Sequence, residues 1–316
     1  MSGICFTYFA ANAATEEMRS VFEVLLKVCG KGKYEVRTIM KIQFLGTAAA
    51  EGIPALFCTC DNCKKSREIG GRAFRSRSQA IIDDKLLIDF PADTLMHVLQ
   101  HNVHMENVKH CLITHTHSDH LYPADIRMME PGFGHLPEGY HMTFYGTEQV
   151  GEAILPTIAI RLKKFNRCSF KEVKAFSTIE VDSYKVTALP AIHDQISGPV
   201  FYQISDGEKT MLYGNDTHYF DESVWEFWAK ESPYFDLVSL DCTDANRPVP
   251  YIGHMGLQDN MRVRDRMIAE GYADDKTVFI CNHFSHNGPN VVYDEFVPIA
   301  WKEGFMTSYD GMIVRV

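Results

Sequence analysis

Short runs of apolar residues, each ending in polar residues, recur along most of the chain. The segment 40–46 predicts a first strand that enters a turn. Further strands are predicted at 78–83, 85–89, 108–114, 141–145, 184–189, 200–204, 211–214, 236–240 and 277–281. We expect the segments 78–83 and 85–89 to form a hairpin around Asp83 and Asp84.

Apolar residues recur with helical spacing in longer segments between these strands. Helices are predicted at 92–100, 148–160, 222–230, 257–269 and 293–301. Strands and helices in this order favour a two-sheet core covered by helices. Because no repeat, low-complexity tract or linker divides residues 40–316, we expect one domain there.

Residues 1–39 have a different pattern. Thr15 can cap a helix that has Glu16 and Glu17 in its first turn and ends near Gly30. A lysine-rich stretch then precedes Met40, which stands where a natural start could lie. We interpret 1–39 as an N-terminal extension of unknown function that contains a helix. The alternative is an ordinary N-terminal helix whose apolar face docks on the body.

Composition and charge limit the binding partners and the cellular compartment that we expect for the chain. The chain has 31 basic and 41 acidic residues and a net charge of −10, which argues against nucleic-acid polymers and anionic membranes as partners. No run of eighteen apolar residues occurs and no basic segment opens the chain, so we predict neither a membrane span nor a signal peptide. The expected location is the cytoplasm. Nine cysteines and fourteen histidines in such a chain indicate metal binding more than disulfides.

The densest chemical signal follows the predicted strand 108–114. Three histidines and an aspartate occur within six positions, at His115, His117, Asp119 and His120. The first two imidazoles can point to one place while Asp119 and His120 face a second place nearby, so one loop can supply two adjacent cations. The alternative is a chance cluster of surface histidines.

Three further candidate ligands follow later predicted strands. They are His193, Asp216 and His283. A single residue of this kind is more often a hydrogen-bonded structural group than a metal ligand. A carboxylate such as Asp216, however, can bridge two cations, because each of its two oxygens can bind one. As a set, the seven residues resemble the metallo-β-lactamase superfamily, whose His-x-His-x-Asp-His motif is followed at a distance by a histidine, an aspartate and a histidine.

The resemblance implies a fold and a ligand set. The fold is α/β (α+β), the αββα sandwich of two central mixed sheets flanked by helices. A first metal would be held by His115, His117 and His193, and a second by Asp119, His120 and His283, with Asp216 bridging the two. Asp119 would also belong to the catalytic residues. The carboxylate at Asp216 favours the dinuclear phosphodiesterases and hydrolases of the superfamily over its zinc β-lactamases, in which the bridging carboxylate is absent.

A second cluster places three thiols at Cys58, Cys60 and Cys63. Three thiolates at this spacing can hold a tetrahedral zinc ion with one more ligand, for which His286 is the candidate. The loop from His283 to His286 would then reach both metal sites. The alternative is three reduced, partly buried cysteines. The other six cysteines are scattered and are interpreted as core thiols.

With this cluster, residues 40–316 resemble the phosphoribosyl 1,2-cyclic phosphate phosphodiesterase (PhnP) family. That resemblance implies two divalent ions, manganese or zinc, in the active site and one structural zinc. It implies that a hydroxide held between the two ions opens a small, cyclic phosphodiester. By the same resemblance His254 would protonate the leaving oxygen and Asp241 would orient an imidazole. The alternative for His254 is a helix-capping or surface histidine.

Two segments depart from the family. Ala48-Ala49-Ala50 stands where the family often has glycines, and Leu121 to Asp125 lacks the common glycine after His120. We therefore expect this chain to share the reaction type of the family more closely than its substrate. Alternatives are a lactonase or thioesterase on the same metals, and a non-catalytic metal-binding carrier like PqqB. The sequence leaves open whether the chain forms a homodimer.

Overall fold

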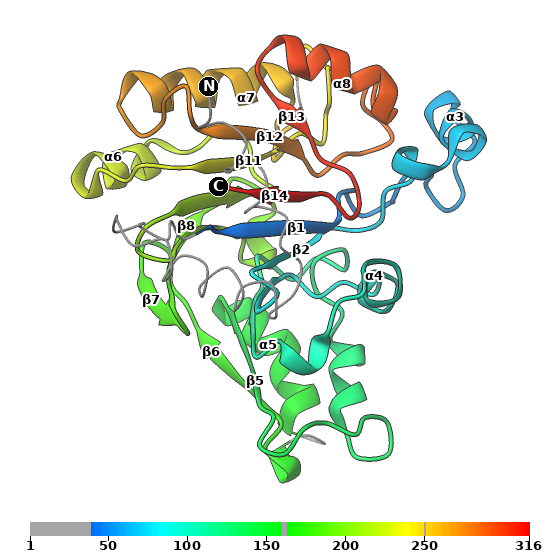
Figure 1. Ribbon diagram of the computed structural model, residues 1–316, viewed down its shortest axis with the longest axis vertical. Coiled ribbons are helices and arrows are strands. Elements are labelled where there is room, and N and C mark those ends of the chain that lie inside the picture. Colours follow the sequence, from blue (N-terminus) through cyan, green and yellow to red (C-terminus); the bar gives the residue numbers. More distant parts are fainter. Residues whose placement is uncertain (1–38, 160–162, 250) are drawn as a thin grey trace, which may run out of the picture. The chain divides into compact units, whose positions relative to one another are not determined.

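The computed structural model describes residues 39–159, 163–249 and 251–316 (Figure 1). Ile39–Val316 form one compact unit. The helix expected near residues 15–30, and the interpretation of 1–39 as an extension, lie outside the described residues. No helix in the described ranges is both long and apolar enough to cross a bilayer.

The first of two seven-stranded sheets joins the beginning of this unit to its end. Its order is β14 (Ile313–Arg315), β1 (Lys41–Gly46), β2 (Gln79–Ile82), β3 (Leu86–Ile88), β4 (His110–Leu112), β5 (Met142–Gly146) and β6 (Cys168–Glu172). The pairs from β14 to β3 are antiparallel and those from β3 to β6 are parallel. Asp83 and Asp84 connect β2 to β3 with φ of 49° and 58°, which is the left-handed geometry of a tight hairpin turn.

The second sheet has the order β13 (Met306–Thr307), β12 (Val278–Asn282), β11 (Leu237–Asp241), β10 (Thr210–Gly214), β9 (Val200–Ser205), β8 (Tyr184–Pro190) and β7 (Thr178–Val181). Its strands are antiparallel from β7 to β10 and parallel from β10 to β13. Two antiparallel pairings, β8 with β9 and β9 with β10, make β8 run in the same direction as β10, β11 and β12. These four strands therefore end at the same edge of the sheet.

Apolar side chains fill the space between the sheets and both outer faces. Ile42 and Phe44 of β1 pack in one buried cluster with Val186 of β8 and Tyr202 of β9. Helices α6 (Glu222–Glu231), α7 (Leu257–Ala269) and α8 (Tyr293–Lys302) cover the second sheet (Figure 1). Helix α5 (Glu148–Thr157) packs on the first sheet and α4 (Thr94–His101) contacts β1. The layers confirm the predicted αββα sandwich with two mixed sheets.

Some elements differ from the sequence prediction. Helix α3 (Asp61–Ile69) and strands β6, β7, β13 and β14 were not predicted. The four strands lie at the sheet edges and each has a single buried residue, so their hydrophobic signal is weak. Strand β4 is shorter than the predicted 108–114 because the Thr114 amide donates to the Asp89 carboxylate, 2.8 Å away, rather than to a neighbouring strand.

Candidate metal centre

The loops that leave the converging strand ends place seven candidate ligands around one cavity. His115, His117, Asp119 and His120 follow β4, while His193, Asp216 and His283 follow β8, β10 and β12. The ligand atoms of His115, His117 and His193 lie within 4.8 Å of one another. Those of Asp119, His120, Asp216 and His283 form a second group within the same limit. The structure therefore brings together the two sets expected from the sequence.

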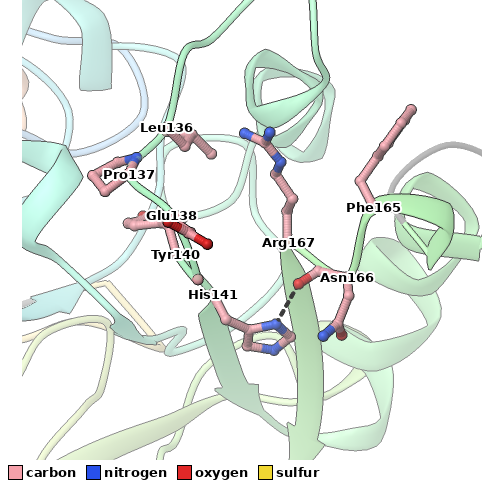
Figure 2. A pocket seen from close by; sticks show the side chains of 9 residues that line it. Leu136, Pro137, Glu138, Tyr140, His141, Phe165, Asn166 and Arg167 are labelled. Carbon is pink, nitrogen blue, oxygen red and sulfur yellow. Dashed lines mark hydrogen bonds between the residues drawn. The ribbon is translucent and has the colours of Figure 1, made fainter.

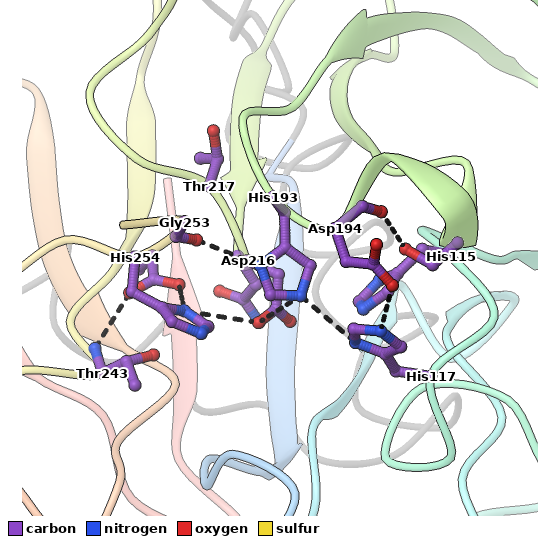
Figure 3. Close-up of polar contacts among 12 residues, drawn as sticks. His115, His117, His193, Asp194, Asp216, Thr217, Thr243, Gly253 and His254 are labelled. Atoms are coloured by element: carbon purple, nitrogen blue, oxygen red, sulfur yellow. Dashed lines mark hydrogen bonds and ion pairs between the residues drawn. The ribbon is translucent and has the colours of Figure 1, made fainter. Parts of the chain in front are cut away.

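Asp216 faces histidines of both sets, and its carboxylate lies beside His193 (Figure 3). Its Oδ2 is 2.5 Å from His120 Nε2 and 3.1 Å from His283 Nε2. Its Oδ1 is 3.9 Å from His193 Nε2. Asp216 and His283 both adopt left-handed backbone, with φ of 49° and 61°. Such conformations cost on the order of 1–3 kcal/mol each and concentrate at functional sites.

Hydrogen bonds behind the imidazoles fix which nitrogen faces the cavity. The Nδ1–H groups of His120 and His193 donate to Asp89 Oδ2 at 2.6 Å and to the Gly253 carbonyl at 3.1 Å. His283 Nδ1 likewise lies 2.9 Å from Thr243 Oγ1. Each of these rings therefore presents Nε2 to the centre, as histidine ligands held by outer partners do.

His117 has the opposite orientation. Its Nε2 lies 3.2 Å from Asp194 Oδ2, and its Nδ1 lies 3.2 Å from His193 Nε2. The ring therefore turns Nδ1 toward the other histidine nitrogens. Asp194 fixes this tautomer from the cavity rim, because a carboxylate only accepts hydrogen bonds.

The donor atoms fit divalent cations. His115 Nε2 is buried without a hydrogen-bond partner among the described residues. His120 Nε2 and His283 Nε2 lie 3.3 Å apart, so both lone pairs and the Asp216 carboxylate converge on one point. Imidazole and carboxylate are the ligands that zinc and manganese accept. The geometry suits one cation in each set.

Burial and charge set the protonation of these imidazoles. Burial lowers the pKa of His115 well below its usual value, and the neighbouring His120 lowers it further. Burial also opposes the charged form of His283, but the Asp216 and Asp119 carboxylates outweigh it and raise the pKa of His283 to about 10. Cation binding at His283 must therefore displace a proton.

His254 lies beside the same cavity (Figure 3). Its Nδ1–H donates to Asp241 Oδ2 at 3.0 Å and lies 3.5 Å from Asp216 Oδ1. Burial lowers the pKa of His254, yet the charge and hydrogen bond of Asp241 leave the pKa raised overall. The Thr243 and Met255 amides donate to Asp241 Oδ1, so this carboxylate is itself held in place. Asp241 and His254 also form a group with Asp216 and His283 whose ligand atoms lie within 4.8 Å of one another, so His254 is a competing metal ligand by geometry.

Two cavities differ in the chemical groups that line them. The cavity at the histidines has a volume of about 230 Å³ and is lined by Ala49, Ala50, Glu51, His117, Asp119, His193, Asp216, Thr243, His254, His283 and Ser285. A cavity of about 330 Å³ lies beside β5 and β6 around His141 and Arg167 (Figure 2). Among the described residues, none of the candidate metal groups lies in that second cavity. The smaller cavity is therefore the candidate active site.

The cysteine cluster forms a separate four-residue site. The ligand atoms of Cys58, Cys60, Cys63 and His286 lie within 4.8 Å of one another. His286 Nδ1 is 3.5 Å from both Cys58 Sγ and Cys60 Sγ. The Asn62 side chain donates to the His286 and Gly288 carbonyls, both at 2.9 Å, and so ties the two segments together. Three thiols and one imidazole in this arrangement suit a tetrahedral structural zinc.

We expect Cys60→Ser to remove about one equivalent of zinc and to lower the free energy of unfolding by at least about 3 kcal/mol, because structural zinc stabilises the fold directly. Metal analysis and chemical denaturation measure the two effects. Cys168→Ser is the matched control, since Cys168 is a buried thiol of β6 outside the cluster. Unchanged zinc content in Cys60→Ser would show that the cysteines are ordinary reduced thiols.

Comparison with known proteins identifies the family. The beta-lactamase superfamily domain matches residues 85–273, which is more than half of the chain. No curated protein sequence matches. A diphosphatase of the PhnP family has a TM-score of 0.68 and 19% identity, over 88% of this chain and 98% of that one. Zinc-bound PqqB from Methylobacterium extorquens has a TM-score of 0.63 and 16% identity, over 87% and 99%.

The short form of human tRNase Z has the same fold, with a TM-score of 0.58 and 14% identity over 87% of this chain and 98% of that chain. At these identities the structures establish the architecture and leave the substrate open. The domain match and the shared architecture agree with the buried histidine and aspartate groups. The chain belongs to the beta-lactamase superfamily and has the metallo-β-lactamase fold.

Proposed function

We propose that the chain is a cytoplasmic, dinuclear metal-dependent phosphodiesterase that hydrolyses a small, cyclic phosphodiester such as phosphoribosyl 1,2-cyclic phosphate. The observation that carries the proposal is the Asp216 carboxylate, which faces both sets of histidines at once. Two such sets, one of them containing Asp119, suit a pair of divalent ions, manganese or zinc. The cysteine cluster would hold a structural zinc.

Each group has a role in the proposed reaction. Bound cations supply Lewis-acid activation of water and of the phosphate group. Hydrolysis adds water across one P–O bond, so the leaving oxygen must take up a proton. His254 lines the cavity, and with Nδ1 held by Asp241 its Nε2 is free to deliver that proton.

Proteins of similar structure support hydrolysis of phosphorus–oxygen bonds as the reaction type. One of them is a diphosphatase of the PhnP family. Diphosphates are therefore a second substrate class to test, in addition to the cyclic phosphodiesters. A carrier role like that of PqqB is disfavoured, because both histidine sets and the bridging Asp216 are intact here. Neither a nucleic-acid polymer nor a membrane is a proposed partner.

Metal analysis combined with a substrate panel tests the proposal. We expect two divalent ions in addition to zinc, and manganese-supported hydrolysis of bis-p-nitrophenyl phosphate and nucleoside 2′,3′-cyclic phosphates. The panel also contains a diphosphate, a lactone and a thioester. Faster turnover of the thioester or the lactone would favour the carboxylic-ester hydrolases of the fold. A fully metallated protein without activity on any phosphodiester or diphosphate would refute the proposal.

A further inference from the structure

One rim of the candidate active site carries a carboxylate. Glu51 follows the three alanines that stand in place of the expected glycines, and it lines the cavity with Ala49 and Ala50. Its Oε1 accepts hydrogen bonds from Ser285 Oγ at 3.1 Å and from Asn287 Nδ2 at 3.3 Å. The side chain is still 38% exposed. Glu51 is therefore oriented by its neighbours and retains an oxygen that can meet a ligand.

Among the described residues that line the cavity, the basic side chains are imidazoles of the candidate metal centre and His254, and neither lysine nor arginine is available to a second phosphate. The carboxylates of this lining are Glu51, Asp119 and Asp216. A metal pair between the histidine sets would neutralise the reacting phosphate alone. A further phosphate placed beside Glu51 would meet that carboxylate without a lysine or arginine among the described lining residues.

Two arginines of the segment that follows helix α3 are engaged elsewhere. Arg75 is buried and donates to Thr47 Oγ1 at 2.8 Å and to the Ser308 carbonyl at 2.7 Å. Arg77 pairs with Asp93 at 3.1 Å and donates to the Ala50 carbonyl at 2.9 Å. Neither guanidinium lines the active-site cavity. Arg247, whose Nη2 donates to the Asn287 carbonyl at 3.0 Å, also stays outside the cavity lining, so Glu51 supplies the charge of this part of the lining.

An apolar surface continues from the rim. A neighbouring cavity of about 390 Å³ is lined by Glu51, Ala55, Leu56, Phe57 and Cys58, so Glu51 belongs to both cavities. Leu56 is 74% and Phe57 98% exposed. An exposed ring beside a phosphate site suits a stacked base or another flat apolar group.

We propose that Glu51 selects substrates by accepting a hydrogen bond from a free hydroxyl and repelling a second phosphate, while Phe57 contacts an aromatic base. The substrate class is then a nucleoside cyclic phosphate with a free 5′-hydroxyl. This inference rests on the proposed phosphodiesterase function and adds a substrate class to it. It narrows the proposed substrates to cyclic phosphodiesters without a further phosphate, and so disfavours phosphoribosyl 1,2-cyclic phosphate itself.

A matched pair of substrates tests the role of Glu51. Adenosine 2′,3′-cyclic phosphate and its 5′-phosphorylated form differ only at the group expected to meet the carboxylate. We expect the metal-loaded protein to prefer the 5′-hydroxyl form by at least about tenfold in kcat/KM, since two negative charges at close range repel by that order. Glu51→Gln should reduce this ratio and Glu51→Lys should reverse it.

Binding of products provides a readout without turnover. Calorimetry should show weaker binding of adenosine 3′,5′-bisphosphate than of adenosine 3′-monophosphate, with the difference reduced in Glu51→Gln. The control is Glu68→Gln, because Glu68 is an exposed carboxylate of α3 outside the cavity. This control should keep the original ratio and the original metal content.

Phe57→Ala tests the second contact. We expect it to lower kcat/KM for adenosine 2′,3′-cyclic phosphate by roughly fivefold or more, since stacking on an aromatic side chain contributes substantially to base binding. The 2,3-cyclic phosphate of 1-O-methyl ribose, which lacks a base, should be unaffected. Equal losses for both substrates would overturn the assignment of Phe57.

The outcomes separate this inference from the proposed function. Hydrolysis of bis-p-nitrophenyl phosphate with equal kcat/KM for the two adenosine substrates would overturn the inference and leave the function standing. Inactivity on all phosphodiesters would overturn both. Loss of zinc in Glu51→Gln with an unchanged substrate ratio would mean that Glu51 instead orients His286, whose Nε2 lies 3.9 Å from Glu51 Oε1.

Discussion

Asp216→Asn is expected to leave fewer than two divalent ions in the active site and to lower kcat by more than about 10³-fold. The carboxylate lies within 4 Å of His120, His193 and His283, so it serves both histidine sets. An amide of similar shape removes the negative charge and one of the two oxygen ligands. One carboxylate, Asp119, would then balance the charge of the two cations, where the original site has two carboxylates. Metal analysis and turnover of bis-p-nitrophenyl phosphate measure the effect.

Asp275→Asn is the matched control for this substitution, because Asp275 is exposed in the turn before β12 and lies outside the site. It should retain the full metal content and activity. If Asp216→Asn kept both ions and normal turnover, Asp216 would have no bridging role. A loss of the cysteine-bound zinc alone would indicate a general folding defect.

His254→Ala is expected to lower turnover of a nucleoside cyclic phosphate by about 10²–10⁴-fold while the metal content stays the same. The reason is that the leaving alkoxide would lose its proton donor, whereas none of the seven proposed ligands would change. The loss should be smaller for bis-p-nitrophenyl phosphate, because p-nitrophenolate leaves without protonation. Comparing the two substrates therefore distinguishes proton donation from a structural role.

His135→Ala is the control, since His135 is an exposed histidine outside the cavity. Loss of one metal ion in His254→Ala would assign His254 as a ligand instead, which the group of Asp216, Asp241, His254 and His283 permits geometrically. An equal loss on both substrates, with intact metal content, would argue against proton donation.

Much of the fold could be predicted from local patterns. The central parallel strands β3, β4, β5, β10, β11 and β12 are short and largely buried, and a polar residue follows each of them within two positions, so the sequence marks them clearly. The pairing of β14 with β1 could not be predicted, because it joins the two ends of the described unit and depends on tertiary packing. Helix α3 was missed because its apolar positions are few and its buried residues are Cys63 and Ser66.

The candidate ligands could be predicted because metal chemistry restricts residue type and spacing. Their supporting residues could not, since a lone aspartate or threonine has no such signature. Asp89 and Asp194 were missed, although Asp89 ends a predicted strand and so gave the same signal as the ligands. The sequence also gives no sign that Arg75 is buried, with its guanidinium carbon 4.1 Å from the centre of the Phe284 ring.

The position of β14 has a consequence for synthesis of the chain. His115 to His120 emerge early, while His283 and the strand that completes the first sheet come from the last few dozen residues. Until those residues leave the ribosome, an edge of β1 is unpaired and the histidine loop lacks its later partners. The nascent protein therefore lacks a complete second set of ligands until the segment that contains His283 has emerged, so the cation of that set can be selected only late in synthesis.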